Sequence, residues 1–147
     1  YFFAAGNHNT VTRCVASDCE NGMNVQKEND MLVMNCAFTG NTVCALRLDV
    51  SPTIAVDNRF EGNWVDVMAY GDAEVTLGNN QFQGSGSCAL YLRDIPYSRI
   101  LDNQFLDSQG SSIQCHGVNG QSAQYRASAY ALQQKNPALV KGWIFLC

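Results

Sequence analysis

Three short segments of the chain place acids, an arginine and a histidine at one common spacing. The motifs YGD, RD and CHG contain Asp72, Asp94 and His116 at intervals of 22 residues, and Arg93 precedes Asp94 directly. Two neighbouring carboxyl groups can cleave a glycosidic bond, because one protonates the leaving oxygen while the other acts as base or nucleophile. Asp72, Asp94, Arg93 and His116 are therefore the candidate catalytic residues.

Four further residues suit the binding of a sugar chain. They are Arg47, Asp49, Tyr91 and Gln114. Sugar rings stack on tyrosine, and arginine pairs with the carboxylates of uronic acids, so the expected partner is an acidic polysaccharide or oligosaccharide. The alternative is that these charged side chains are simply solvated and form surface pairs that contribute little.

A repeat of 22 or 23 residues sets this spacing. Its clearest row is a set of phenylalanines, Phe38, Phe60, Phe82 and Phe105. Two positions before the phenylalanines stand Cys36, Asn58, Asn80 and Asn103, and three positions before them stand Asn35, Asp57, Asn79 and Asp102. A bend at one phase selects Asn or Asp, because both tolerate the left-handed backbone region. Stacked asparagine amides can also bond one another along the axis, so we expect an asparagine ladder.

Each repeat is too short for two helices and carries three short strands instead. Runs of about four β-branched or aliphatic residues, such as MLVM, TIAV and EVTL, are bounded by Asn, Asp, Gly or Ser. We therefore expect an all-β fold, a right-handed parallel β-helix of about five coils. Each residue then pairs with the residue one repeat later, at about 4.8 Å, and the phenylalanines stack inside.

Alternation along the strand after each phenylalanine decides which residues face outward. We take Leu46, Met68, Leu90 and Ile113 as one inward row. The expected outward rows are then Arg47, Ala69, Tyr91 and Gln114, and next to them Asp49, Gly71, Arg93 and His116. Asp72 and Asp94 follow at the edge of the same strand, one coil apart. This predicts one outer face that gathers all the candidate residues.

The repeated N-x-F motif, followed by short strands, resembles the right-handed parallel β-helix proteins of the pectate-lyase-like superfamily. The resemblance covers roughly residues 6–118. That superfamily includes polysaccharide lyases, polygalacturonases, epimerases, phage tailspikes and non-catalytic repeat modules. It implies an extracellular or periplasmic location.

The acids and the histidine also resemble the acid-acid-His ladder of polygalacturonases, with clear departures. Asp72 lacks the Asn-Thr that precedes the first acid in those enzymes, and no Arg-x-Lys follows His116. A lyase would need an arginine or lysine as base, with calcium on the carboxylates. Arg93, flanked by Asp72 and Asp94, is the nearest candidate for that base. No cofactor is otherwise implied.

The final stretch departs from the repeat. Residues 122–136 contain good helix formers and are followed by Pro137, so the sequence predicts a helix there. Together with the apolar tail, residues 119–147 are expected to cap the coils of residues 1–118 within one domain. Nothing comparable precedes Tyr1, so we expect the first coil to be covered by a partner, by another copy or by further residues.

Composition narrows the class of partner. Hydrophobic residues make up 46% of the 147-residue chain and charged residues 15%, which is typical of a globular domain. The net charge is −4 and there is no basic run, which argues against nucleic acid and against an anionic membrane surface.

Seven cysteines occur without a CxxC motif, which argues against a structural zinc site. Cys14 and Cys36 share a phase on adjacent coils, where either a disulfide or two small buried thiols would fit. Cys44 and Cys88 lie two coils apart, with Asp66 expected between them, either exposed or bonded to a turn.

Two functional interpretations stay open. One is a carbohydrate-associated module that binds or cleaves acidic polysaccharide on the outer face, as a lyase or a glycoside hydrolase if it is an enzyme. The other is a non-catalytic structural or interaction module, such as part of a larger β-helix protein, a tail fibre or a surface protein.

Overall fold

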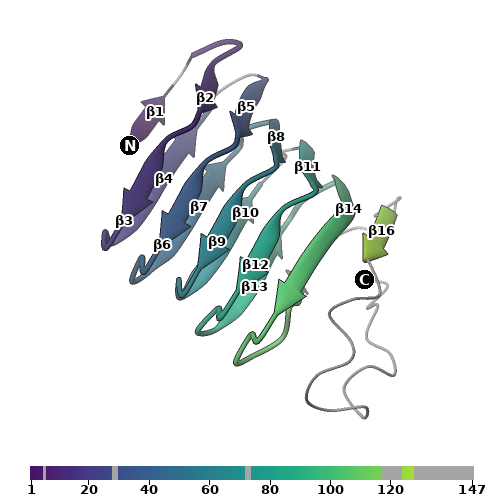
Figure 1. The fold of residues 1–147 in the computed structure, drawn as a ribbon. Coiled ribbons are helices and arrows are strands. Elements are labelled where there is room, and N and C mark those ends of the chain that lie inside the picture. Colours follow the sequence, from purple (N-terminus) through teal and green to yellow (C-terminus); the bar gives the residue numbers. More distant parts are fainter. Residues whose placement is uncertain (5, 28–29, 72–73, 117–123, 128–147) are drawn as a thin grey trace.

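The computed structural model describes residues 1–4, 6–27, 30–71, 74–116 and 124–127. The described residues form sixteen strands and no helix, and all their pairings are parallel. Figure 1 shows the coils stacked one behind another, with equivalent strands side by side. The prediction of an all-β parallel solenoid of about five coils is confirmed.

One strand from each coil contributes to a six-stranded sheet. Its members are β1 (Phe2–Ala4), β4 (Asn21–Gln26), β7 (Cys44–Asp49), β10 (Val65–Tyr70), β13 (Cys88–Arg93) and β15 (Ile113–His116). This sheet carries most of the candidate site residues on its outer surface.

The other strands form two stacks that β14 (Tyr97–Leu106) joins, because it pairs with both of them. The first stack contains β2 (Thr10–Thr12), β5 (Met31–Met34), β8 (Thr53–Val56), β11 (Glu74–Gly78) and β16 (Gln124–Ala127). The second stack contains β3 (Val15–Ser17), β6 (Ala37–Thr39), β9 (Arg59–Glu61) and β12 (Gln81–Gln83).

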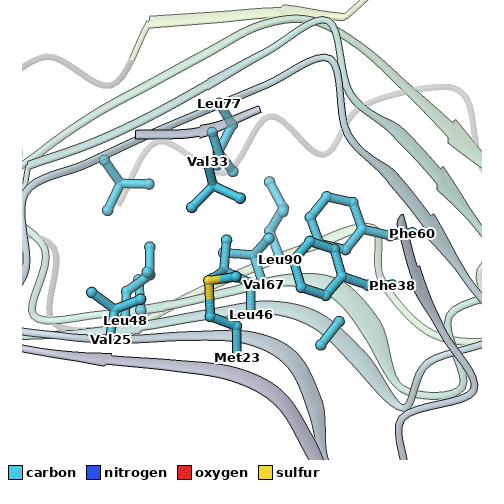
Figure 2. Packing of buried hydrophobic residues seen from close by; sticks show 14 of the residues in the cluster. Met23, Val25, Val33, Phe38, Leu46, Leu48, Phe60, Val67, Leu77 and Leu90 are labelled. Atoms are coloured by element: carbon cyan, nitrogen blue, oxygen red, sulfur yellow. The ribbon is translucent and has the colours of Figure 1, made fainter. Parts of the chain in front are cut away.

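The phenylalanine row forms an interior stack, as predicted. Ring centroids lie 5.0 Å apart between Phe38 and Phe60, 4.9 Å between Phe60 and Phe82, and 5.0 Å between Phe82 and Phe105. Leucines and valines of the six-stranded sheet face these rings across the core (Figure 2). The core is therefore a set of parallel columns, each built from equivalent positions of successive coils.

The asparagine ladder is also confirmed. Asn58 donates from Nδ2 to Oδ1 of Asn80 at 3.0 Å, and Asn80 donates in the same way to Asn103 at 2.9 Å. Each amide is buried and also donates to a backbone carbonyl oxygen, of Val33, Ala55 or Leu77. The preceding row adopts the left-handed conformation expected of a repeated bend, with φ between 52° and 57° at Asn35, Asp57, Asn79 and Asp102.

The register of the six-stranded sheet differs from the prediction at one coil. Val67, not Met68, pairs with Leu46 on one side and with Leu90 on the other. Val67 follows Phe60 by seven residues, whereas Leu46 follows Phe38 by eight and Leu90 follows Phe82 by eight. Because side chains alternate along a strand, a shift of one residue exchanges the inward and outward positions of β10.

The helix predicted over residues 122–136 is wrong where the structure describes it. Gln124–Ala127 form β16, which pairs with β14 in parallel. Pairing with an exposed strand edge outweighs the weak helix propensity of this segment. The rest of that prediction lies outside the described residues.

Candidate ligand-binding face

Two half-exposed rows run across the coils on the outer surface of the six-stranded sheet. The register places Asn24, Arg47, Met68, Tyr91 and Gln114 in the first row. The second row contains Gln26, Asp49, Tyr70, Arg93 and His116. We call these ten positions the outer face.

One cation–π contact and two ring–ring contacts follow one another across this outer face. The guanidinium carbon of Arg47 lies 5.5 Å from the ring centroid of Tyr70. Tyr70 and Tyr91 follow at 5.9 Å between ring centroids, and Tyr91 and His116 at 5.2 Å. Four consecutive coils therefore present a connected strip of flat, polarisable side chains.

The outer face includes contacts with a small buried apolar cluster that is separate from the main core. Cys44, Val65 and Cys88 share one phase at the start of their strands and are almost completely buried, and Met68 and Tyr91 pack against them. Burial also raises the pKa of the Tyr70 phenol, so Tyr70 remains a neutral hydrogen-bonding group at physiological pH.

Six of the predicted site residues lie on this face: Arg47, Asp49, Tyr91, Arg93, Gln114 and His116. The predicted outward positions of Ala69 and Gly71 are wrong: Ala69 is buried in the core, and the outward position of this coil belongs to Tyr70. The sequence-based alignment missed Tyr70 because it assumed a constant repeat. The shorter step after Phe60 is visible only in the paired register, because Phe60 and Phe82 keep the ordinary spacing of 22 residues.

Of the two predicted catalytic acids, the structure describes Asp94. Asp94 lies at a corner of its coil, where its φ is 55°. On the neighbouring coil the equivalent position is Gly71, because the Gly71 N–H donates to the carbonyl oxygen of Arg93. The Asp94 carboxylate pairs with Arg93 at 3.4 Å between Oδ2 and Nε, and both side chains are exposed. Asp72 lies outside the described residues.

A buried carboxyl group inside the solenoid is the second unusual feature. Asp66 is fully buried; its Oδ1 accepts a hydrogen bond from Asn63 at 2.9 Å and its Oδ2 accepts one from Ser85 at 2.6 Å. Val65, not Asp66, shares the phase of Cys44 and Cys88. Burial raises the pKa of Asp66 to about 6, although the two hydrogen bonds oppose that rise.

Asp66 ends a second asparagine ladder. Asn41 donates to Oδ1 of Asn63 at 2.8 Å, and Asn63 then donates to Asp66 rather than to the next coil, where Ser85 replaces the asparagine. Asp66 therefore supplies the acceptors that a continued asparagine row would have supplied. It is a structural group and takes no part in the outer face.

The potential metal ligands are dispersed in the part of the chain that the structure describes. No three His, Cys, Asp or Glu side chains there are placed to hold one metal ion, and calcium therefore has no support among these residues. Cys14 and Cys36 are separate thiols, so the disulfide is not formed. Burial raises the pKa of Cys36 and of Cys44, and that of Cys88 to about 11, which disfavours the thiolate that binds metals.

Comparison with known proteins identifies one family. The family model described as "Periplasmic copper-binding protein (NosD)" matches residues 1–123. No curated protein and no solved structure matches the chain. The resemblance to the narrower pectate-lyase-like superfamily is not confirmed by these comparisons. No helix in the described residues is long and apolar enough to cross a membrane.

Proposed function

The chain belongs to the family of periplasmic copper-binding proteins (NosD), and we propose that it is a binding module that holds an acidic polysaccharide on its outer face. The family description agrees with the expected extracellular or periplasmic location. Polysaccharide as the ligand is our inference from side-chain chemistry. In this proposal the solenoid is a rigid platform and carries out no reaction itself.

The strip Arg47–Tyr70–Tyr91–His116 is the observation that carries the proposal. Its centroid separations of 5.2–5.9 Å are close to the spacing of successive coils, so the strip runs along the solenoid axis. An extended sugar chain could lie along it, with its rings against the tyrosines. Arg93 is 58% exposed beside the strip; its Nε pairs with Asp94 at the surface, and a uronate carboxylate would bind its terminal nitrogens.

Catalysis has weaker support than binding. The described carboxylates near the strip are Asp49, which ends β7, and Asp94, which follows β13, and these two strands lie on either side of β10. Asp94 is already engaged with Arg93. Glycosidic cleavage requires two carboxyl groups facing one bond, with one of them held protonated. Asp72, which was predicted to pair with Asp94 for that purpose, lies outside the described residues, so the pair stays a prediction.

The described residues do not fit a copper site. Copper favours clusters of imidazole nitrogen and sulfur ligands. His8 and His116 lie on the first and the last of the described coils, and Cys44 and Cys88 are separated by Val65 on the intervening strand. We therefore derive no copper chemistry from these side chains.

Calorimetric titration of the wild-type protein and an Arg93→Gln variant with hexagalacturonate tests the proposal. We expect the variant to bind about tenfold more weakly, because it loses the charge-assisted contact with a carboxylate. Arg99→Gln is the matched control, since Arg99 is an exposed arginine on β14, away from the outer face. Equal affinity of Arg93→Gln and wild type, or no binding by wild type, would contradict the proposal.

A further inference from the structure

A second surface feature lies at the turn between β9 and β10. A shallow hollow of about 260 Å³ opens there on the outside of the solenoid. Three successive coils line it, through Gly40, Asn41 and Thr42, through Gly62, Asn63 and Trp64, and through Gly86. Trp64 lies four residues before Met68, whose row contains Arg47 and Tyr91, and six residues before Tyr70, so about 13 to 20 Å of strand separates the hollow from the aromatic strip of the outer face.

Glycine creates this hollow. A Cβ atom on Gly62 would meet nothing within 4 Å, so the space above this backbone is open. Gly62 also has a φ of 63°, which most side chains resist. On the next coil, a Cβ on Gly86 would come within 2.7 Å of the Trp64 ring. The indole therefore lies directly on the Gly86 backbone, which holds it in one orientation.

Trp64 is 55% exposed, which leaves a large apolar ring in contact with solvent. A tryptophan in such a position presents an aromatic face together with the indole N–H as a donor. No described residue accepts a hydrogen bond from that N–H. The Thr42 hydroxyl, which donates only weakly to the Cys19 carbonyl at 3.5 Å, adds an accepting oxygen to the lining.

The hollow has no charged side chain in its lining. The amides of Asn41 and Asn63 donate inward to their ladder and to backbone carbonyls, so they do not compete for a ligand. An uncharged lining with one aromatic face, one donor and one acceptor matches a neutral pyranose ring. A uronate would find no cation among these residues to offset the desolvation of its carboxylate.

We propose that Trp64 and the glycine-lined hollow bind one neutral pyranose ring of a glycan. The apolar C–H face of the sugar stacks on the indole, and its hydroxyl groups exchange hydrogen bonds with Thr42 and the indole N–H. This subsite is separate from the outer face and does not depend on the binding of acidic glycans there.

Fluorescence titration of a Trp143→Phe variant tests the proposal, because Trp64 is then the only tryptophan of the two in the chain. The probes are maltohexaose, cellohexaose and mannohexaose, with hexagalacturonate as the charged comparison. We expect a saturable change with at least one neutral hexaose, and the same affinity when Arg93→Gln is added. A response to hexagalacturonate alone, or no response to any probe at millimolar concentration, would overturn the proposal.

Two glycine variants test whether the hollow is the binding site while they keep the fluorescent Trp64 side chain. Gly62→Asn places an amide in the hollow at a left-handed position that asparagine tolerates, and it should weaken neutral binding about tenfold or more. Gly84→Asn is the matched control, since Gly84 has a φ of 68° on the adjacent coil but does not line the hollow. Unchanged binding by Gly62→Asn, or equal losses in both variants, would count against the hollow as the site.

Discussion

Asp66 is a carboxyl group enclosed by the solenoid, with Asn63 and Ser85 as its two hydrogen-bond donors. Its interior location raises its pKa from 3.8 to about 6 because burial disfavours the charged form. The folded protein therefore holds a proton on Asp66 over a pH range in which the unfolded chain has released it. Between about pH 4 and 6, stability must fall as the pH rises, since the folded state binds more protons there.

We predict that Asp66→Asn abolishes this pH dependence. The wild-type free energy of unfolding should decrease by about 2 kcal/mol from pH 4 to pH 6, whereas the variant should remain nearly constant. Asparagine keeps the acceptor for Asn63, and its amide can donate to the Ser85 hydroxyl oxygen. Urea unfolding at several pH values measures the difference, and a parallel pH profile of both proteins would refute this role for Asp66.

At the scale of the elements, the buried asparagine ladder connects neighbouring coils through side chains as well as strands. Asn80 has four side-chain hydrogen bonds: it accepts from the N–H and the amide of Asn58, and it donates to the Ala55 carbonyl and to Asn103. Asn80→Ala would leave buried donors and acceptors unpaired. We expect it to lower the free energy of unfolding by about 3 kcal/mol or more.

Asn79 provides the matched control for this prediction. It is the exposed neighbour of Asn80, it has a φ of 52°, and its amide donates to Asp57 at the surface. Asn79→Gly should change the stability little, because glycine adopts the left-handed conformation without strain. Urea unfolding monitored by circular dichroism would contradict the ladder's role if Asn80→Ala and Asn79→Gly were equally stable.

Much of this architecture is predictable from the sequence, because a solenoid repeats the same environment at the same phase. Phe60 and Phe82 occupy equivalent interior positions, and the bend at Asp57 recurs at Asn79, so identical or similar residues mark both rows. The site was less predictable. One residue fewer after Phe60 was enough to move Tyr70 into the outward row, and the pattern of spacing alone did not reveal that shortening.

The environments of two further residues were not predictable for a related reason. Asp66 and Trp64 each occur on one coil only, so no repeated row indicates their environment. Asp66 was assigned to the phase of Cys44 and Cys88, whereas the structure places it inside with Asn63 and Ser85. The surroundings of Trp64 are set by glycines of successive coils, which become adjacent only in the folded solenoid.

At the scale of the whole molecule, the periplasmic solenoid presents two chemically different surfaces, one along the outer side of β10 and one at the turn before it. The outer face combines arginine, tyrosine and histidine side chains on the outer surface of β10 and its neighbouring strands, while the hollow before β10 is uncharged. The overall charge of −4 would repel an acidic glycan at long range, so the affinity must come from local contacts. Binding of hexagalacturonate should therefore strengthen only modestly at low salt.

The most direct test follows the tyrosine ring resonances of the protein by NMR during titration with hexagalacturonate, with Tyr→Phe variants for assignment. We predict saturable shifts for Tyr70 and Tyr91, which lie side by side on the outer face, and none for Tyr97 on β14. Saturable binding that leaves the Tyr70 and Tyr91 resonances in place, or that shifts Tyr97 instead, would contradict the assignment of this face as the glycan site.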